Sequence, residues 1–186
     1  FDKTRAQRMP AAEARAFRRK YAKPEEKIIL YTGRLIGVKG LEYLIKSLKH
    51  VKYDCKCLIV GDGPDKDRLE MLAKEELADA DFTGFRSDIA SFLSIADVFI
   101  LPSLSESLNY SLVEAAYTGV PIVCTDIGII SKESAILVKP MDEKSLANGI
   151  NTALEKNNSK IIASARRYAR SFDWNKAADE YMDIME

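Results

Sequence analysis

Apolar runs alternate with stretches of helical spacing along most of the chain. Leu41, Leu44 and Leu48, for example, recur three or four positions apart, which predicts a helix with one buried face. Uninterrupted apolar runs are instead typical of strands that a parallel sheet buries on both faces. Runs of this kind occupy residues 28–32, 55–60, 97–101, 120–124 and 135–138, and a weaker one lies near 81–83.

This order of strands and helices predicts an α/β fold: one Rossmann-like, doubly wound parallel sheet of about six strands, with helices on both faces and a C-terminal helical tail. Residues 1–26 are charged and alanine-rich, and we expect a helix over 5–21 that Pro24 ends. We interpret this segment as a linker or helix remnant that precedes the domain at 27–186. Ligands of such sheets bind at the carboxyl ends of the strands, so the loops there are the candidate sites.

The composition supports a sizeable core and limits the kinds of partner. Hydrophobic residues make up 47% of the chain, and 28 lysines and arginines balance 28 aspartates and glutamates. A neutral domain has no overall field that would attract nucleic acid or an anionic membrane, so we expect no nucleic-acid partner and only local phosphate sites. Cys55, Cys57 and Cys124 lie in apolar, strand-like stretches, which favours reduced, buried thiols in a cytoplasmic protein.

The single histidine, His50, lies at the lysine-rich end of a predicted helix, where a cation near a helix C-terminus is the simplest interpretation. With only this histidine, at this position, we exclude a Ser-His-Asp triad, a Cys-His pair and a histidine-based metal site within the chain. No apolar run approaches the roughly 20 residues that are needed to span a bilayer.

The first candidate site is a glycine-containing turn between the strand at 28–32 and the next helix. Arg34 and Lys39 lie in this turn, which begins at Gly33. Glycine lets the backbone approach a ligand closely, the following helix N-terminus favours anions, and two cations there can neutralise a leaving diphosphate. The segment at 61–64, Gly-Asp-Gly-Pro, has no following Lys-Ser/Thr, so we expect a tight turn there rather than a phosphate loop.

A second candidate site is a pair of carboxylates at a strand–loop–helix junction. Glu106 lies in the loop, and Glu114, eight residues later, lies in the following helix. Both can line one crevice, where carboxylates are suitable acceptors for sugar and ribose hydroxyls. Because the neighbours of Glu114 are apolar, we expect its carboxylate to have a partner rather than to lie on a solvated face.

Taken in order, these motifs resemble the donor domain of glycosyltransferase family 4, whose members have the GT-B architecture. The chain carries Gly-Arg-x4-Lys-Gly, Val-Gly-Asp-Gly-Pro, Gly-Phe, Pro-Ser-x2-Glu-x7-Glu-Ala and Gly-Val-Pro-Ile-Val, from about residue 28 onward. Each motif alone is weak evidence, but the ordered set is specific. The resemblance implies a C-terminal nucleotide-sugar donor domain, one half of a GT-B enzyme.

The resemblance also implies a role for each candidate residue. Arg34 and Lys39 match the basic pair that contacts the donor diphosphate, and Glu106 matches the residue that contacts the donor sugar. These three are the predicted catalytic residues, and Glu114 matches the residue that holds the ribose. The remaining predicted donor-binding residues are Gly33, Leu108, Asn109, Tyr110 and Ser111 near the phosphates, and Phe85 and Arg86 near the nucleobase.

Two stretches depart from the family pattern. Where the family usually has Glu-x-Phe-Gly, this chain has Glu-Ser-Leu-Asn, ending at Asn109. Asparagine is a favoured N-cap, so we expect Asn109 to cap the following helix, although its side chain leaves phosphate less room than glycine does. The loop after Gly128 lacks the usual paired glycines and is shorter than usual by a few residues.

The implied activity is that of a hexosyltransferase that retains the configuration of the sugar. The donor would be a UDP-, GDP- or ADP-sugar and the acceptor a glycan or a lipid-linked glycan, in polysaccharide or glycolipid biosynthesis. The resemblance implies neither a cofactor nor a metal, because basic side chains and helix dipoles neutralise the diphosphate. We expect the missing N-terminal acceptor domain to be required for transfer, and any peripheral membrane contact to come through that half.

Two other functions remain open on these residues. One is half of a sugar-nucleotide epimerase of similar architecture, although such an enzyme needs further acid–base residues that this half does not offer. The other is a non-catalytic nucleotide-binding module on the same scaffold, for which Asn109 is the best support. A flavodoxin-like receiver is disfavoured, because no acidic cluster ends the first strand.

Overall fold

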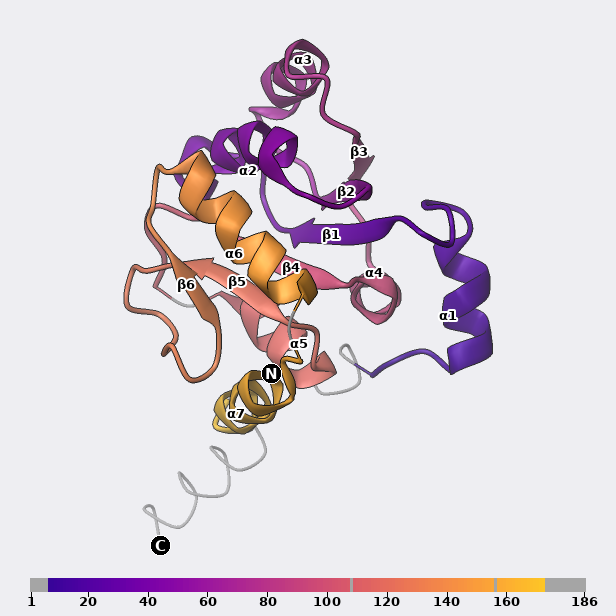
Figure 1. The fold of residues 1–186 in the computed structure, drawn as a ribbon, viewed down its shortest axis with the longest axis vertical. Helices are drawn as coiled ribbons and strands as arrows, with labels where there is room; N and C mark the ends of the chain where they lie inside the picture. The colour runs from indigo at the N-terminus through magenta and orange to yellow at the C-terminus, as the bar shows by residue number, and fades with distance from the viewer. Residues whose placement is uncertain (1–6, 108, 156, 173–186) are drawn as a thin grey trace, which may run out of the picture.

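The computed structural model describes residues 7–107, 109–155 and 157–172. It contains a six-stranded sheet in the order β3-β2-β1-β4-β5-β6, and every neighbouring pair is parallel. This topology confirms the predicted Rossmann-like α/β fold (Figure 1). The strands are β1 (Lys27–Thr32), β2 (Cys55–Val60), β3 (Ala80–Gly84), β4 (Val98–Leu101), β5 (Ile122–Thr125) and β6 (Ile136–Val138).

The central strands are buried on both faces, as their uninterrupted apolar runs predict. In the middle of the sheet, Leu30 of β1 lies between Leu58 of β2 and Phe99 of β4, and all three side chains have no exposed surface. Alternate residues of each strand join separate hydrophobic clusters on the two faces, because successive side chains point to opposite sides of a sheet. Both faces therefore need a covering layer of helices.

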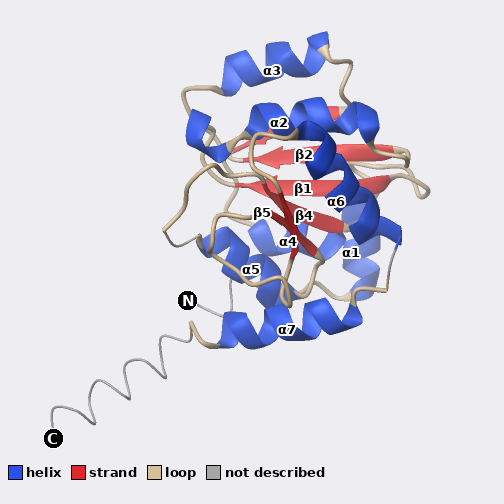
Figure 2. Cartoon of the chain, turned by 60° about the vertical axis from the view of Figure 1, so that its left-hand side comes forward, coloured by secondary structure: helices blue, strands red, loops and turns tan. Residues whose placement is uncertain are grey.

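Two groups of helices supply these layers (Figures 1 and 2). One hydrophobic cluster includes residues of α1 (Ala11–Arg18), α4 (Ile89–Ile95), α5 (Tyr110–Thr118) and α7 (Ser159–Arg170). The cluster on the other face includes residues of α2 (Leu41–Ser47), α3 (Lys66–Glu75) and α6 (Glu143–Glu155). Two short 3-10 helices, η2 (Gly37–Lys39) and η3 (Leu48–His50), flank α2. None of the described helices is long and apolar enough to cross a membrane.

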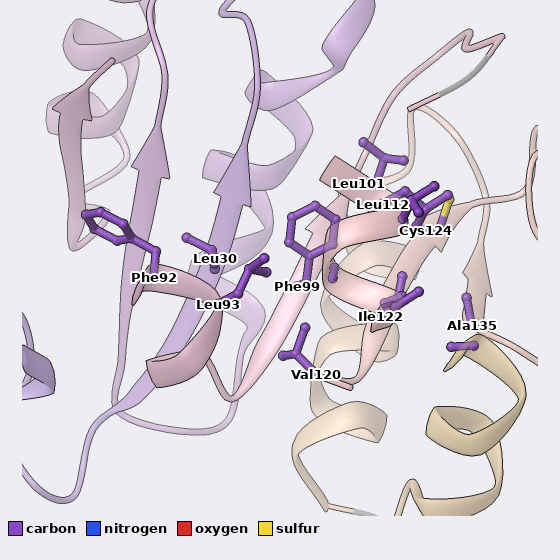
Figure 3. Close-up of a cluster of buried hydrophobic side chains, with 14 of the residues drawn as sticks. Leu30, Phe92, Leu93, Phe99, Leu101, Leu112, Val120, Ile122, Cys124 and Ala135 are labelled. Carbon is purple, nitrogen blue, oxygen red and sulfur yellow. The ribbon is translucent and has the colours of Figure 1, made fainter. Parts of the chain in front are cut away.

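Figure 3 shows part of the cluster on the face that α4 and α5 cover. Phe99 of β4 lies among aliphatic side chains of the sheet and of these two helices, and it is fully buried. Burial of apolar surface of this kind is the main stabilising contribution to such a layer. The layer holds the N-terminal ends of α4 and α5 close to the carboxyl ends of the strands.

The first helix is shorter than the sequence predicted. It begins at Ala11, after Pro10, rather than near residue 5, and it ends at Arg18. This helix packs on the body of the domain: the rings of Phe17 and Phe92 meet edge to face with centroids 5.3 Å apart. The Arg18 guanidinium also donates to Asp97 at 2.7 Å, directly before β4. The division of the chain at residue 26 stays a prediction.

The helix bounds near the candidate site agree with the sequence. Residues 110–118 predict a helix that Gly119 ends, with Pro121 just beyond it. The helix α5 spans Tyr110–Thr118 and ends at Gly119 in a left-handed conformation with φ 80°. By contrast, the apolar positions Leu69, Leu72 and Leu77 predict one helix, but Leu77 lies beyond the end of α3 and is 92% exposed. Predicted helical residues after 172 lie outside the described part of the chain.

Candidate functional site

A cavity of about 510 Å³ opens at the carboxyl ends of β1 and β2, beside the N-terminus of α5. The strand order reverses between β1 and β4, and this is where doubly wound sheets bind ligands. The predicted site residues that line the cavity are Gly33, Arg34, Phe85, Arg86, Tyr110, Ser111 and Glu114. Its wall also contains five residues that the sequence did not assign to the site: Thr32, Val60, Gly61, Asp62 and Ile89.

Three further predicted residues form a cluster of their own. The carboxylate oxygen Oε1 of Glu106 accepts hydrogen bonds from Lys39 Nζ at 2.5 Å and from Asn109 Nδ2 at 2.8 Å. A third donor, Ser103 Oγ at 2.9 Å, comes from the segment after β4 and was not predicted. We call Lys39, Ser103, Glu106 and Asn109 the carboxylate cluster. Leu108, also predicted, lies outside the described residues.

Burial and hydrogen bonding act in opposite directions on the Glu106 carboxyl group. Its side chain is 7% exposed, and this burial by itself would raise its pKa. The hydrogen bonds from Lys39, Asn109 and Ser103 outweigh burial and leave the pKa of Glu106 below its usual value. Glu106 is therefore ionised at neutral pH and is held at one oxygen, Oε1. No described residue donates a hydrogen bond to Oε2.

A close backbone approach brings Lys39 to Glu106. The loop after β1 meets the loop after β4, where Leu104 N donates to Val38 O at 2.8 Å. Gly40 has φ 64°, and a Cβ at this position would lie only 2.1 Å from Pro102 O. Glycine is needed here for both reasons, because a side chain would clash and the left-handed conformation would be strained. The contact places η2, which carries Lys39, against the residues before α5.

The loop after β1 is also held from its other side, by the segment after β2. Leu35 N donates to Asp62 O at 2.9 Å, and Asp65 N donates to Leu35 O at 3.1 Å. Gly61 lies so close to this loop that a Cβ would approach Gly33 O to 1.9 Å. The segment expected to be a simple turn therefore also supports the loop of Arg34 and supplies part of the cavity wall.

Arg34 lies exposed in the cavity wall, and among the described residues its guanidinium forms no ion pair. Its backbone is fixed from below by Tyr31, whose hydroxyl donates to Arg34 O at 3.0 Å. Burial of Tyr31, together with the negative charge of Glu106, raises the pKa of this phenol, so it stays a neutral donor. The guanidinium is thus available to an anion that enters the cavity.

The far wall of the cavity combines an aromatic ring with a paired cation. The ring of Phe85 is 80% exposed. Arg86 donates to both carboxylate oxygens of Asp88, at 2.8 and 2.9 Å, and its guanidinium lies 5.4 Å from the ring centroid of Phe92. Arg86 is therefore held in place rather than free, whereas Phe85 presents an open surface on which a planar group could stack.

The N-terminus of α5 carries two of the predicted residues. Asn109 is its N-cap: the side-chain oxygen Oδ1 accepts from Leu112 N at 3.0 Å, as the sequence predicted. One turn further, Glu114 is only 9% exposed and lines the cavity. A buried carboxylate in a cavity at the end of a parallel sheet can accept hydrogen bonds from ligand hydroxyls.

Other ionisable groups add no second centre within the described ranges. All three cysteines are free thiols, and burial raises the pKa of Cys124 to about 12. No group of three or more His, Cys, Asp or Glu side chains is placed to hold a metal ion in the part of the chain that the structure describes. His50 Nε2 lies 3.6 Å from Glu143 Oε1, on the α2–α6 side of the sheet.

The sequence matches a known family and several named relatives. The family model described as "Glycosyl transferases group 1" matches residues 13–172. A putative teichuronic acid biosynthesis glycosyltransferase of Bacillus subtilis is 32% identical over 130 residues, which cover 68% of this chain and 32% of that protein. The α-D-kanosaminyltransferase of Streptomyces kanamyceticus is 30% identical over 150 residues, covering 74% of this chain and 39% of that protein.

The chain also superposes on parts of longer solved structures that have a similar fold. Sucrose-phosphate synthase from Thermosynechococcus elongatus superposes with a TM-score of 0.83 at 26% identity, covering 96% of this chain and 49% of that one. Anabaena Alr3699/HepE in complex with UDP-glucose superposes with a TM-score of 0.89 at 22% identity, covering 100% and 55%. The chain thus spans about a third to half of the length of these relatives.

Proposed function

The chain belongs to the group 1 glycosyl transferases, and from this we propose that it is the nucleotide-sugar donor-binding domain of a retaining hexosyltransferase. One observation carries the proposal. A cavity with an exposed cation, Arg34, and a buried carboxylate, Glu114, lies at the switch point of the sheet, next to the ionised Glu106. Cations suit a diphosphate and carboxylates suit hydroxyl groups, and a nucleoside-diphosphate sugar carries both kinds of group.

We assign the donor to these residues part by part. Arg34 takes the diphosphate from the cavity side. Lys39 takes it from the other side, because an ammonium group has three N–H donors and Glu106 accepts from one of them. Glu114 accepts from the ribose and Glu106 from the sugar, while the base lies against the exposed ring of Phe85. This arrangement follows the order base, ribose, diphosphate and sugar along the cavity and into the carboxylate cluster.

The names of similar proteins support a nucleotide-sugar donor without selecting its base. The Anabaena protein is described with UDP-glucose. A relative from Mycobacterium tuberculosis, 28% identical over 179 residues, is named a GDP-mannose-dependent mannosyltransferase. We therefore keep UDP-, GDP- and ADP-sugars as the donor class.

In the proposed reaction the acceptor hydroxyl replaces the nucleoside diphosphate at the anomeric carbon, and the sugar keeps its configuration. Arg34 and Lys39 stabilise the negative charge that develops on the leaving diphosphate, so that no divalent metal is required. The departing phosphate or a group of the acceptor domain takes the proton of the acceptor hydroxyl. The acceptor is a glycan or a lipid-linked glycan.

We further propose that transfer needs a second domain, which faces the carboxyl edge of the sheet. Four of the six exposed large hydrophobic residues among those described lie on this edge: Val38, Phe85, Tyr110 and Met141. They follow β1, β3, β4 and β6, respectively. Two of them, Phe85 and Tyr110, line the cavity, and exposed apolar groups at a binding site are typical of a surface that another domain covers. The 186-residue chain should therefore bind the donor without transferring its sugar.

Calorimetric titration of the chain tests the proposal. The probes are UDP, GDP and ADP, together with UDP-glucose, GDP-mannose and ADP-glucose, each with and without EDTA. We expect one nucleotide and its sugar to bind, with unchanged affinity in the presence of EDTA. Binding of none of the six would overturn the donor site, and binding that EDTA abolishes would overturn the metal-independent version. A nucleotide that binds as tightly as its sugar form would favour the non-catalytic nucleotide-binding module.

A further inference from the structure

Both the oxygen and the nitrogen of the Asn109 side-chain amide form hydrogen bonds. Its oxygen Oδ1 accepts from Leu112 N at 3.0 Å and so caps α5, while its nitrogen Nδ2 donates to Glu106 Oε1 at 2.8 Å. The backbone of Asn109 is extended, with φ −116° and ψ 106°, which is ordinary for an N-cap residue. A single planar group therefore ties the Glu106 carboxylate to the first turn of a helix.

The donors to Glu106 converge on one oxygen from three parts of the chain. Lys39 comes from the loop after β1 and Ser103 from the segment after β4, and Asn109 completes the set from the N-cap of α5. Three donors at Oε1 exceed the two lone pairs of a carboxylate oxygen, so this atom has no capacity left for a ligand. Oε2, to which no described residue donates, is the atom that remains for a ligand hydroxyl.

Building on the proposed function, we propose that Asn109 is a positioning residue that fixes Glu106 through Oε1 and so presents Oε2 to the hydroxyls of the donor sugar. It does not touch the donor in this role. Its effect reaches the sugar through the orientation of the Glu106 carboxylate.

Residue chemistry explains why asparagine suits this position. Capping requires an acceptor and the contact with Glu106 requires a donor, and the asparagine amide supplies both. Serine supplies an equally good cap but lacks the terminal amino group that reaches Glu106. Aspartate supplies a cap but would place a second negative charge where Nδ2 now lies, 2.8 Å from Glu106 Oε1. Glycine has no side chain for either contact.

The decisive variant is Asn109→Ser, because it keeps the cap and removes only the donor to Glu106. We expect its melting temperature to fall less than that of Asn109→Ala, which loses the cap as well, and its affinity for the bare nucleoside diphosphate to be unchanged. The affinity for the corresponding nucleotide sugar should fall about tenfold, the size expected for one hydrogen bond to a charged group. Calorimetry with UDP and UDP-glucose, GDP and GDP-mannose, and ADP and ADP-glucose measures this ratio.

Two further variants separate positioning from folding. Asn109→Ala loses the cap as well, so its melting temperature should fall in addition to the sugar-nucleotide affinity. Asn109→Asp keeps the cap, and its affinity for the nucleotide sugar should fall more than tenfold because of charge repulsion. If Asn109→Ser does not fold, the ratio measured on Asn109→Asp decides the question.

A double-mutant cycle with Glu106→Ala shows whether Asn109 acts through the carboxylate. In that background, Asn109→Ser should produce no further loss of nucleotide-sugar affinity. An undiminished loss there, an equal loss for nucleotide and nucleotide sugar, or an unchanged ratio would each overturn the positioning role while leaving donor binding intact. If the wild-type chain binds none of the six probes, the proposed function fails and this inference fails with it.

Discussion

Two adjoining parts of the site differ in how their charges are balanced before a ligand binds. In the cavity, Arg34 is exposed and, within the described ranges, has no ion-pair partner. In the carboxylate cluster, Lys39 and Glu106 are paired at 2.5 Å and their side chains are only 17% and 7% exposed. In the cavity the charge of Arg34 remains available to a ligand. In the carboxylate cluster the charges of Lys39 and Glu106 are paired with each other within the fold. Arg34 and Lys39, which the sequence places in one turn, thus differ in exposure and in ion pairing.

This difference predicts opposite responses to the same kind of substitution. Removing Arg34 should affect binding and leave stability unchanged, since its guanidinium forms no ion pair with any described residue. Removing Lys39 should affect both, because Glu106 would stay buried without a cation. The predictions below test this contrast, starting with the largest expected effect.

Lys39→Ala should lower the free energy of unfolding by about 2–3 kcal/mol, since it leaves an ionised, nearly buried carboxylate with only neutral donors. Urea denaturation followed by circular dichroism measures this. Lys23→Ala is a matched control: Lys23 pairs with Glu26 at 3.5 Å with its side chain 73% exposed, so its removal should change little. Adding Glu106→Ala to Lys39→Ala should recover part of the loss. Equal effects of Lys39→Ala and Lys23→Ala would contradict a role for the pair in stability.

Arg34→Ala should weaken binding of the nucleoside diphosphate by about 2 kcal/mol, as expected for a hydrogen bond between charged groups. Its unfolding midpoint in urea should match that of the wild-type chain. Arg68→Ala, which removes an exposed arginine outside the cavity wall, is the control for a general change of charge. A drop in stability with unchanged affinity would reverse the contrast between Arg34 and Lys39.

Glu114→Gln and Glu106→Gln should separate the nucleotide from the sugar. Glu114→Gln is expected to weaken the nucleoside diphosphate and its sugar form alike, by about 1.5 kcal/mol, because the ribose is common to both. Glu106→Gln should weaken only the sugar form. Both affinities come from one calorimetric series. A Glu106→Gln chain that loses both ligands equally would show that Glu106 is assigned to the wrong part of the donor.

Thr32→Val should have the smallest effect and the opposite sign. The Thr32 hydroxyl is buried and has no hydrogen-bond partner among the described residues, so replacing it with a methyl group should stabilise the chain by about 1 kcal/mol. Thr125→Val is the control, since the Thr125 hydroxyl donates to Ser103 O and its loss should destabilise. A loss of stability in Thr32→Val, seen in thermal melts, would mean that a water or ligand satisfies this hydroxyl.

Local patterns were sufficient for the fold and for the place of the site. Apolar runs predicted the six strands, and Gly119 marked the end of α5 because the left-handed conformation there favours glycine. The first helix was predicted too long because its charged, alanine-rich composition favours helix on both sides of Pro10. Leu77 was wrongly assigned to the helix of Leu69 and Leu72, because α3 ends at Glu75 and Leu77 has a left-handed conformation with φ 54°.

Contacts between distant segments could not be predicted from the sequence. Lys39 and Glu106 are 67 positions apart, and they meet only because one loop docks on the other at Gly40. The hydrogen bond from Asn109 to Glu106 depends on the orientation of the Asn109 side-chain amide, which no sequence motif predicts. Thr32 and Asp62 were missed because threonine and aspartate at these positions match no binding motif. Their positions at the carboxyl ends of strands did, however, indicate that they could lie near the site.

The close approach of Gly40 to Pro102 also constrains how this domain can be redesigned. Exchanging the loop after β4 for that of a relative would alter the surface on which the loop after β1 rests, and Lys39 would lose its place with it. The conformation of each loop therefore depends on the sequence of the other. Chimeras intended to change donor preference should transplant both loops together, and libraries that vary one loop should keep glycine at position 40.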